Sequence, residues 1–266
     1  MRPRGPGSKL APGYEVVEHL ARGRALDVYD AWSERRGCRC VIKTPRPDRR
    51  KDPMTRRRLL QEGDMLTRLC HPSVVRGYET VRQPSPLVVM ETVGGETVGH
   101  LVERRTLTAT ELAFLGLHLA SAIRYLHDQN IVHLDLKPSN VIAENGRAKV
   151  IDLSIARRPG RAKPGVGTWC YMAPEQARGG AVGPPADVWG IGIVLYAAAA
   201  GDTPFADGDQ EHPQLHMRAP TIRDERPRLP RRLSAAIDAC LEPDPAARPS
   251  TDELMAALEP VAGARG

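Results

Sequence analysis

The spacing of apolar residues divides the chain near residue 95. Before that point, short runs alternate between apolar and polar positions and end at glycine or proline, which is the pattern of half-buried β-strands. A longer segment at 53–69 instead places leucines on one face of a helix. We therefore predict a β-rich first part with one helix and with strands at 14–21, 26–32, 39–44, 74–81 and 87–91.

After residue 95 the apolar spacing becomes helical. Thr108 followed by Glu111 is the signature of a capping box. Apolar residues then recur every three or four positions from 112 to 126, which predicts a long helix with one buried face. Further helices are expected at 186–200, where the run is apolar nearly all round, and at 234–241 and 251–258.

These patterns predict an α+β protein of two lobes, a small β-rich lobe at 14–91 with one helix and a larger, mainly helical lobe at 92–260. Within the second lobe, a short pair of strands is expected to end at Ile151, followed by an irregular stretch. Two lobes imply a cleft between them, which is a usual place for a ligand. The ends of the chain are predicted to be flexible tails at 1–13 and 261–266.

Composition and charge narrow the classes of partner. The 266 residues carry a formal net charge of +6, and basic residues crowd 46–58 and 157–163. No aromatic residues interleave with these runs, so we expect no nucleic-acid partner. The most apolar run, 188–200, is far shorter than the roughly 20 residues that a bilayer requires. The N-terminus lacks the apolar core of a secretion signal, so a cytoplasmic protein without a membrane partner is expected.

The stretch HLDLKPSN at 133–140 concentrates polar chemistry on one short loop. Its Asp, Lys and Asn suit a hydroxyl nucleophile, a phosphate and a metal ion. CVIK at 40–43 precedes this stretch, and GTWCYMAPEQ at 167–176 and DPAARPS at 244–250 follow it. On these motifs the chain resembles the eukaryotic-type protein kinases from near Tyr14 to near Leu258, above all the bacterial serine/threonine kinases.

The resemblance implies the bilobal protein-kinase fold and an enzyme that uses ATP and Mg²⁺. Lys43 matches the strand lysine that holds the α- and β-phosphates, and Glu62 matches its ion-pair partner. Met90 matches the gatekeeper, and the following residues match the hinge that binds adenine through backbone groups. The implied ATP-binding positions are Gly23, Val28, Val41, Lys43, Met90, Glu91, Val93, Ile142 and Asp152.

The same resemblance assigns the catalytic residues. Asp135 matches the residue that orients the substrate hydroxyl and accepts its proton, and Lys137 matches the one that neutralises the transferring phosphoryl group. Asn140 and Asp152 match two metal ligands, whose hard oxygen atoms suit Mg²⁺. Thr168 matches the threonine that contacts the catalytic Asp and Lys beside a serine or threonine substrate.

Three more matches concern the larger lobe. Glu175 is expected to pair with Arg248, and Asp187 is expected to anchor the backbone of the catalytic loop. The motif around Glu175, together with Lys137 and Thr168, organises a peptide-binding segment in the family. This speaks against a third interpretation, a small-molecule phosphotransferase of related fold, and favours a protein substrate with serine or threonine.

The glycine-rich loop departs from the family pattern. Of three expected glycines only Gly23 is present, and Ala21 and Leu26 stand at the other two positions. Glycine lets backbone N–H groups approach phosphates closely, so a stiffer or displaced loop is expected. This departure is the main support for an alternative of another class, a pseudokinase that acts as a binding or scaffold module.

A second departure concerns control. Leu134 stands where most family members have an arginine that pairs with a phosphorylated activation-loop residue. The segment 155–167 contains no Ser, Thr or Tyr, so the phosphate acceptor is missing as well. The hypothesis is an active kinase that needs no activation-loop phosphate. The basic residues of 157–163 either form a solvated surface or dock an acidic substrate or partner, and the sequence leaves the oligomeric state open.

Overall fold

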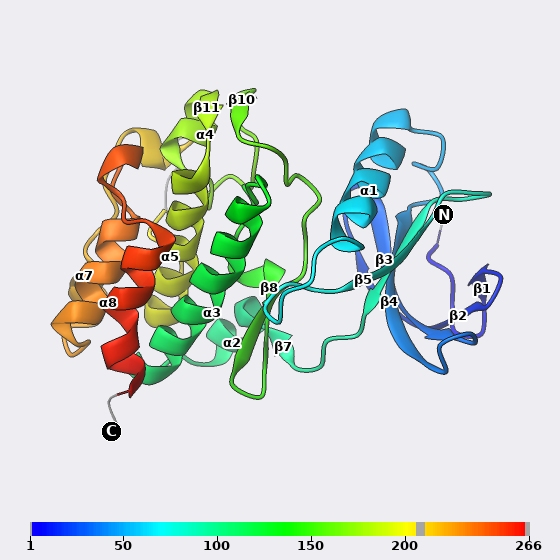
Figure 1. Cartoon of the computed structure of the whole chain (residues 1–266), viewed down its shortest axis with the longest axis horizontal. Coiled ribbons are helices and arrows are strands. Elements are labelled where there is room, and N and C mark those ends of the chain that lie inside the picture. Colours follow the sequence, from blue (N-terminus) through cyan, green and yellow to red (C-terminus); the bar gives the residue numbers. More distant parts are fainter. Residues whose placement is uncertain (1, 206–210, 264–266) are drawn as a thin grey trace. The chain divides into compact units, whose positions relative to one another are not determined.

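The computed structural model describes residues 2–205 and 211–263, which form a first compact unit up to Val93 and a second from Gly94 onward (Figure 1). The first unit is a β-sheet with one helix, and the second is mainly helical. The predicted α+β class, a small β-rich part with one helix followed by a larger helical part, is therefore confirmed.

An antiparallel sheet of six strands forms the first unit, in the order β1-β2-β3-β4-β6-β5. The alternating runs of the sequence form these strands, and β6 has the predicted bounds. The strand β5 is shorter than predicted, because the chain at 74–76 is not in a strand. The strands are β1 (Lys9–Ala11), β2 (Tyr14–Arg22), β3 (Leu26–Ser33), β4 (Cys38–Pro45), β5 (Gly77–Val81) and β6 (Leu87–Glu91).

Residues 7–11, within the predicted tail at 1–13, are hydrogen-bonded to this sheet. Strand β1 pairs with the start of β2, and the amide of Gly7 donates to the carbonyl of Val16 at 2.9 Å. Gly13, with a φ of +78°, makes the tight turn between the two strands. The backbone of this segment is therefore satisfied by sheet pairing and not by water alone.

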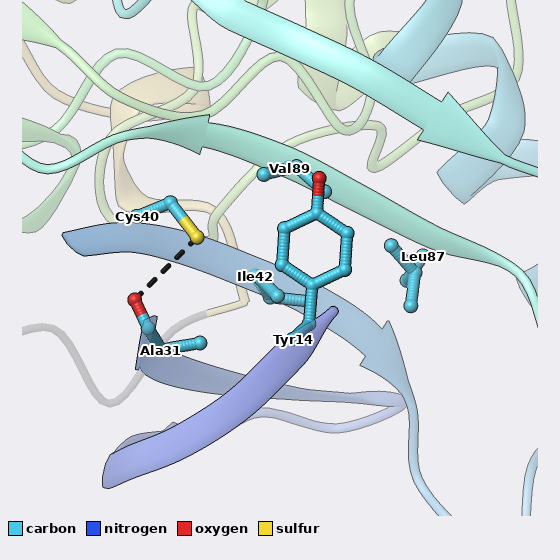
Figure 2. Packing of buried hydrophobic residues seen from close by; sticks show 6 residues of the cluster. All are labelled: Tyr14, Ala31, Cys40, Ile42, Leu87 and Val89. Carbon is cyan, nitrogen blue, oxygen red and sulfur yellow. Dashed lines mark hydrogen bonds between the residues drawn. The ribbon is translucent and has the colours of Figure 1, made fainter. Parts of the chain in front are cut away.

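One face of the sheet carries a small apolar core (Figure 2). Burial raises the pKa of Cys40 to about 12, so its side chain is a thiol, and its Sγ donates to the carbonyl of Ala31 at 3.5 Å. Alternation along β4 sends Cys40 and Ile42 to this face and the residues between and after them to the other. The cluster consists of Tyr14, Ala31, Cys40, Ile42, Leu87 and Val89.

Helix α1 (Pro53–Leu66) lies close to the opposite face of the sheet because two glycines permit it. A Cβ at Gly63 would lie 2.3 Å from Oγ1 of Thr80, and a Cβ at Gly77 would lie 2.7 Å from the backbone of Leu66. The helix ends three residues earlier than predicted, with Thr67 as its C-cap. Because α1 packs this closely, the positions of its buried side chains relative to the strands are fixed.

The second unit is built around α3 and α5, and α8 packs against α3 (Figure 1). The predicted capping box at Thr108 and Glu111 is confirmed. Gly201, with a φ of +100°, ends α5 as predicted. The longer helices are α2 (Val98–Arg104), α3 (Ala109–Asp128), α5 (Pro184–Ala200), α7 (Arg231–Cys240) and α8 (Thr251–Gly263), and the short ones are α4 (Pro174–Arg178) and α6 (Ile222–Glu225).

Short strands complete the second unit. A ladder in the order β7-β8-β9 contains the predicted strand pair, and β10 pairs with β11 in a separate ladder. The second ladder begins inside the stretch that the sequence predicts to be irregular. These strands are β7 (Glu96–Thr97), β8 (Val141–Glu144), β9 (Arg147–Val150), β10 (Gly160–Ala162) and β11 (Gly180–Val182).

The C-terminal helix extends into the predicted tail. Val261 is buried and α8 continues through Gly263. The rest of that tail, 264–266, lies outside the described residues. Among the helices of the described residues, none combines the length and apolar character needed to cross a bilayer.

Candidate active site

The first unit presents one sheet face that combines apolar side chains with a lysine. Val28 lies opposite Lys43 across β3 and β4, and Val41 lies opposite Met90 across β4 and β6. Directly opposed residues share a face, and so do Val41 and Lys43, two positions apart on one strand. Val28 and Val41 are only half-buried. Four of the predicted ATP-binding residues are thus brought together.

Helix α1 holds the carboxylate that pairs with this lysine. The Nζ of Lys43 donates to Oε1 of Glu62 at 2.6 Å, and the two side chains are 10% and 0% exposed. Asp52 caps the start of the helix by accepting from the amides of Met54 and Thr55. Pairing offsets part of the cost of removing both charges from water, and it fixes the ammonium group over the sheet.

The turn that carries Gly23 is tightly held. The amide of Gly23 donates to the carbonyl of Leu26 at 2.8 Å. On either side of the turn, Arg22 makes a bidentate ion pair with Asp27, with distances of 2.7 and 3.0 Å. Arg46 donates from its side chain to two carbonyls of the turn at 3.4 Å each. Side-chain contacts therefore restrain the turn in which two of the family's glycines are absent.

Replacing Asp27 tests this restraint. The Asp27 side chain is 1% exposed, and hydrogen bonds to charged groups contribute about 1.5–3 kcal/mol each. Asp27→Asn is expected to lower the free energy of unfolding at neutral pH by an amount in this range. Asp64→Asn is the matched control, because Asp64 makes a similar pair with Arg82 in an exposed position, where about 1 kcal/mol or less is expected.

The effect of Asp27 should depend on pH. Burial by itself raises the pKa of Asp27, but hydrogen bonds from Arg22 and His19 outweigh burial and hold the pKa below its usual range. Such a carboxylate stabilises the fold above the unfolded pKa of about 3.9, and the contribution is lost as the pH falls through the folded pKa. Urea unfolding at about pH 7, 5 and 3 should therefore show the Asp27→Asn deficit shrinking in acid. A deficit independent of pH would contradict the role given to the ion pair.

The second unit gathers the polar groups of the 133–140 loop around Asp135. Its Oδ1 accepts from the hydroxyl of Thr168 at 2.6 Å, and its Oδ2 lies 3.0 Å from Nζ of Lys137. Lys137 also donates to Oγ1 of Thr168 at 2.8 Å. The side-chain Nδ2 of Asn140 donates to Oδ2 of Asp135 at 3.2 Å and to the backbone carbonyl of Asp135 at 2.9 Å. A carboxylate, an ammonium, a hydroxyl and an amide thus form one network.

A buried carboxylate anchors the backbone of this loop, as the resemblance implies. Asp187, at the start of α5, accepts from the amides of His133 and Leu134 at 2.8 and 2.7 Å and contacts Nε2 of His127 at 2.9 Å. Burial lowers the pKa of His133, so its ring is neutral. Its Nδ1 accepts from the amide of Asp135 at 3.2 Å, which fixes the loop from both sides.

Asn140 and Asp152, the two predicted metal-binding residues, lie on segments that a backbone hydrogen bond joins. The amide of Ile151 donates to the carbonyl of Asn140 at 3.0 Å, which fixes the start of the 152–175 segment beside the loop. Because the side-chain nitrogen of Asn140 is bonded to Asp135, its Oδ1 is the atom left to bind a cation. This oxygen and the carboxylate of Asp152 fit a hard ion such as Mg²⁺.

The segment from Asp152 to Glu175, hereafter the activation segment, is held by backbone pairing at several points. Arg157 and Val132 exchange two backbone hydrogen bonds, of 2.8 and 3.0 Å. Farther along, β10 pairs with β11 over three residues. At the end, Glu175 makes a bidentate ion pair with Arg248, with distances of 2.7 and 2.9 Å.

Comparison with known proteins accords with this geometry. The sequence profile of the family described as the protein kinase domain matches residues 14–258. This chain belongs to the protein kinase family. A probable serine/threonine-protein kinase of Streptomyces coelicolor is 32% identical to this kinase domain over 272 residues, covering 94% of this chain and 40% of the relative.

Two other relatives are named PknB. The probable serine/threonine-protein kinase PknB of Corynebacterium glutamicum is 30% identical over 270 residues, which cover 93% of this chain and 42% of the relative. The serine/threonine-protein kinase PknB of Mycobacterium tuberculosis is 32% identical over 251 residues, which cover 87% and 39%. The kinase domain thus groups with bacterial serine/threonine kinases, and it spans about two fifths of the length of these relatives.

Three other predicted ATP-binding residues lie on or just after strands. Glu91 ends β6 and Val93 follows it in the first unit, whereas Ile142 is half-buried on β8 in the second unit. Motif matching assigned no role to the residues that position the site without belonging to it, namely Gly63, Gly77 and the pair of Arg22 with Asp27. Gly63 and Gly77 could have been suspected as close contacts, since glycine is costly in a helix or strand without such a reason. The Arg22–Asp27 pair has no sequence signal of this kind.

Proposed function

We propose that this kinase domain transfers the γ-phosphate of Mg-ATP to serine and threonine hydroxyls of proteins, and that it does so without a phosphate on its activation segment. The observation that carries the proposal is the network around Asp135, in which Lys137, Asn140 and Thr168 all contact one carboxylate. Phosphoryl transfer needs positioning and charge stabilisation more than covalent chemistry, and this network supplies both.

Each residue then has a role at a stated atom. The carboxylate of Asp135 orients the substrate hydroxyl and takes its proton. The ammonium of Lys137 neutralises charge on the transferring group. Lys43, fixed by Glu62, holds the α- and β-phosphates of the nucleotide. The side-chain oxygens of Asn140 and Asp152 would hold Mg²⁺, which would supply positive charge to neutralise the phosphates of the nucleotide.

Independence from activation-loop phosphate is supported by two absences and by the backbone pairing. Leu134 is apolar and 3% exposed, so this position offers no cation that a phosphate could pair with. The part of the segment at 155–167 has no hydroxyl side chain. Backbone hydrogen bonds at Arg157 and along 160–162 hold this part of the segment without any phosphate. The two parts of a phosphate-dependent switch, an arginine at 134 and an acceptor within 155–167, are both absent from the sequence.

An acidic substrate or partner is the finer proposal for specificity. The side chains of Arg157, Arg158, Arg161 and Lys163 are exposed on the activation segment. Exposed cations on the segment that also carries Thr168 attract acidic peptides and repel basic ones.

The alternative is a pseudokinase that binds a partner without phosphate transfer. One observation favours it: with Leu26 and Ala21 in place of glycine, the turn at Gly23 has less freedom to approach phosphates. The two functions differ in one measurable property, the transfer of labelled phosphate.

The test is phosphate transfer from labelled ATP with Mg²⁺ to a generic basic protein, to acidic and basic peptides containing serine or threonine, and to the chain itself, before and after phosphatase treatment of the kinase. We expect equal transfer by treated and untreated protein, with acidic peptides preferred. Neutralising the four basic residues should remove that preference. Loss of transfer after phosphatase treatment contradicts phosphate independence, and no transfer by folded protein favours the pseudokinase.

A further inference from the structure

One buried glutamine links the activation segment to the loop at 133–140, hereafter the catalytic loop. Gln176 lies on α4, directly after the Glu175 of the ion pair, and is 2% exposed. Its Nε2 donates to the carbonyl of Leu134 at 2.8 Å and to the carbonyl of Val166 at 2.7 Å. Its Oε1 accepts from the amide of Ala173 at 3.0 Å. Both amide protons and the amide oxygen are thus committed to backbone groups of the site.

The carbonyl that Gln176 holds on the catalytic loop belongs to a strained residue. Leu134 has a φ of +66°, a region that residues other than glycine rarely adopt. Such conformations persist only where the surroundings determine them from several sides. Here the carboxylate of Asp187 accepts a hydrogen bond from the N–H of Leu134, and the side-chain amide of Gln176 donates one to the carbonyl of Leu134. The next residue is Asp135, so this peptide sets the direction of the catalytic carboxylate.

The activation segment approaches this position closely because of a glycine. Gly167 has a φ of +134°, and a Cβ there would lie 3.1 Å from both the carbonyl of Leu134 and Nε2 of Gln176. The backbone of Gln176 adds one more bond, accepting from the amide of Gly165 at 3.0 Å. Residues 165–167, in the part of the chain where the phosphate acceptor is missing, are therefore tied to Gln176 through backbone and side chain.

We infer that Gln176 is a positioning residue that links the activation segment to the catalytic loop, as a contact between a phosphate and an arginine would if this chain had one. It joins the activation segment to the residue before Asp135 by neutral, permanently made hydrogen bonds. An arginine and a phosphate join the same two segments by charge and only after modification. The inference rests on the proposed function and deepens it, because it says how this site stays assembled without a phosphate.

The chain provides a matched control in a second buried glutamine. Gln214 is also 2% exposed, and its Nε2 also donates to two carbonyls of the activation segment, those of Trp169 and Met172, at 3.1 Å each. It makes no described bond to the catalytic loop. Loss of Gln214 should loosen the part of the segment after Thr168 and raise the KM for peptide, without disturbing the direction of Asp135.

The experiment compares Gln176→Asn and Gln176→Met with Gln214→Asn and Gln214→Met in steady-state kinetics. The shorter amide reaches fewer partners but keeps a polar group, so it protects against failure to fold. Misplacement of a catalytic group by about 1 Å lowers turnover by about a hundred-fold. We expect kcat to fall about ten- to a hundred-fold in the Gln176 variants, with KM for ATP changed by less than about two-fold. The Gln214 variants should instead raise the KM for peptide.

Hydrogen exchange of the same proteins gives a readout that does not require activity. Exchange should rise at 133–135 and at 163–167 in the Gln176 variants, and at 169–172 in the Gln214 variants. If the wild-type chain transfers phosphate and the Gln176 variants match its kcat, or the Gln214 variants lose as much, the inference is overturned and the proposed function stands. If the wild-type chain transfers nothing, the proposed function fails. Hydrogen exchange at 133–135 then tests whether Gln176 links the two segments. If the Gln176 variants exchange there as the wild-type chain does, the inference is overturned.

Discussion

Asp135→Asn is expected to lower kcat for phosphate transfer by roughly 10²–10⁴-fold, the usual contribution of a positioned general base. The amide has the shape of the carboxylate but cannot take a proton from the substrate hydroxyl. It also loses the charge that holds Lys137, whose Nζ lies 3.0 Å from Oδ2. Thr168 keeps a partner, because its hydroxyl donates to Oδ1, which the amide retains as an oxygen acceptor. The fold should therefore survive the change.

The control separates a lost base from a lost charge. Asp128→Asn removes one negative charge from an exposed position at the end of α3, and kcat should stay at the wild-type value. Single-turnover transfer from labelled ATP measures the chemical step directly. Retention of most of the rate by Asp135→Asn with an intact thermal transition would show that another group takes the proton. The assigned role would then be wrong.

The elements that the sequence predicts well are those whose signal is local. The capping box at Thr108 and Glu111 needs only four consecutive residues. The apolar run of α5 is buried on every side, so no surface pattern was needed to find it. Strand β6 has its predicted bounds because both of its ends are marked by proline, charge or glycine nearby.

The elements that it misses depend on distant partners. Strand β10, Gly160–Ala162, has no apolar alternation and is mostly exposed. It forms only because β11 pairs with it from beyond α4. The apolar spacing predicts that helix α1 continues to residue 69, because Leu69 extends its leucine face. Leu69 is buried, but it lies beyond the end of the helix. A single sequence cannot distinguish these cases, since pairing across many residues leaves no local pattern.

The candidate site shows the same division. Resemblance named Asp135, Lys137, Asn140 and Thr168, and the structure brings them into one network. It did not name Gln176, because a glutamine after a turn has no distinctive chemistry until its partners are known. The partners of Gln176 are backbone carbonyls, which every residue has. Their positions follow from the fold and not from side-chain type.

Arg248→Met is expected to lower the free energy of unfolding by about 3–5 kcal/mol, the usual effect of breaking a buried ion pair from one side. The Arg248 side chain is 0% exposed and that of Glu175 is 14% exposed. Besides the bidentate pair, the guanidinium donates to the carbonyls of Glu242 at 2.7 Å and Pro185 at 2.9 Å. Its CZ lies 5.0 Å from the centroid of the Trp189 ring. Methionine fills the space but leaves the Glu175 carboxylate and these carbonyls without their donor.

Three comparison variants identify the source of the loss. Adding Glu175→Gln to Arg248→Met removes the stranded charge, so the double variant should recover part of the stability. Arg248→Lys keeps the charge but not the fork of donors, and should lose an intermediate amount. Arg124→Met breaks an exposed pair with Asp252, where about 0–1 kcal/mol is expected. Urea unfolding ranks all four. A loss from Arg248→Met no larger than that from Arg124→Met would mean that the buried pair does not hold α4, and with it the end of the activation segment, to the rest of the second unit.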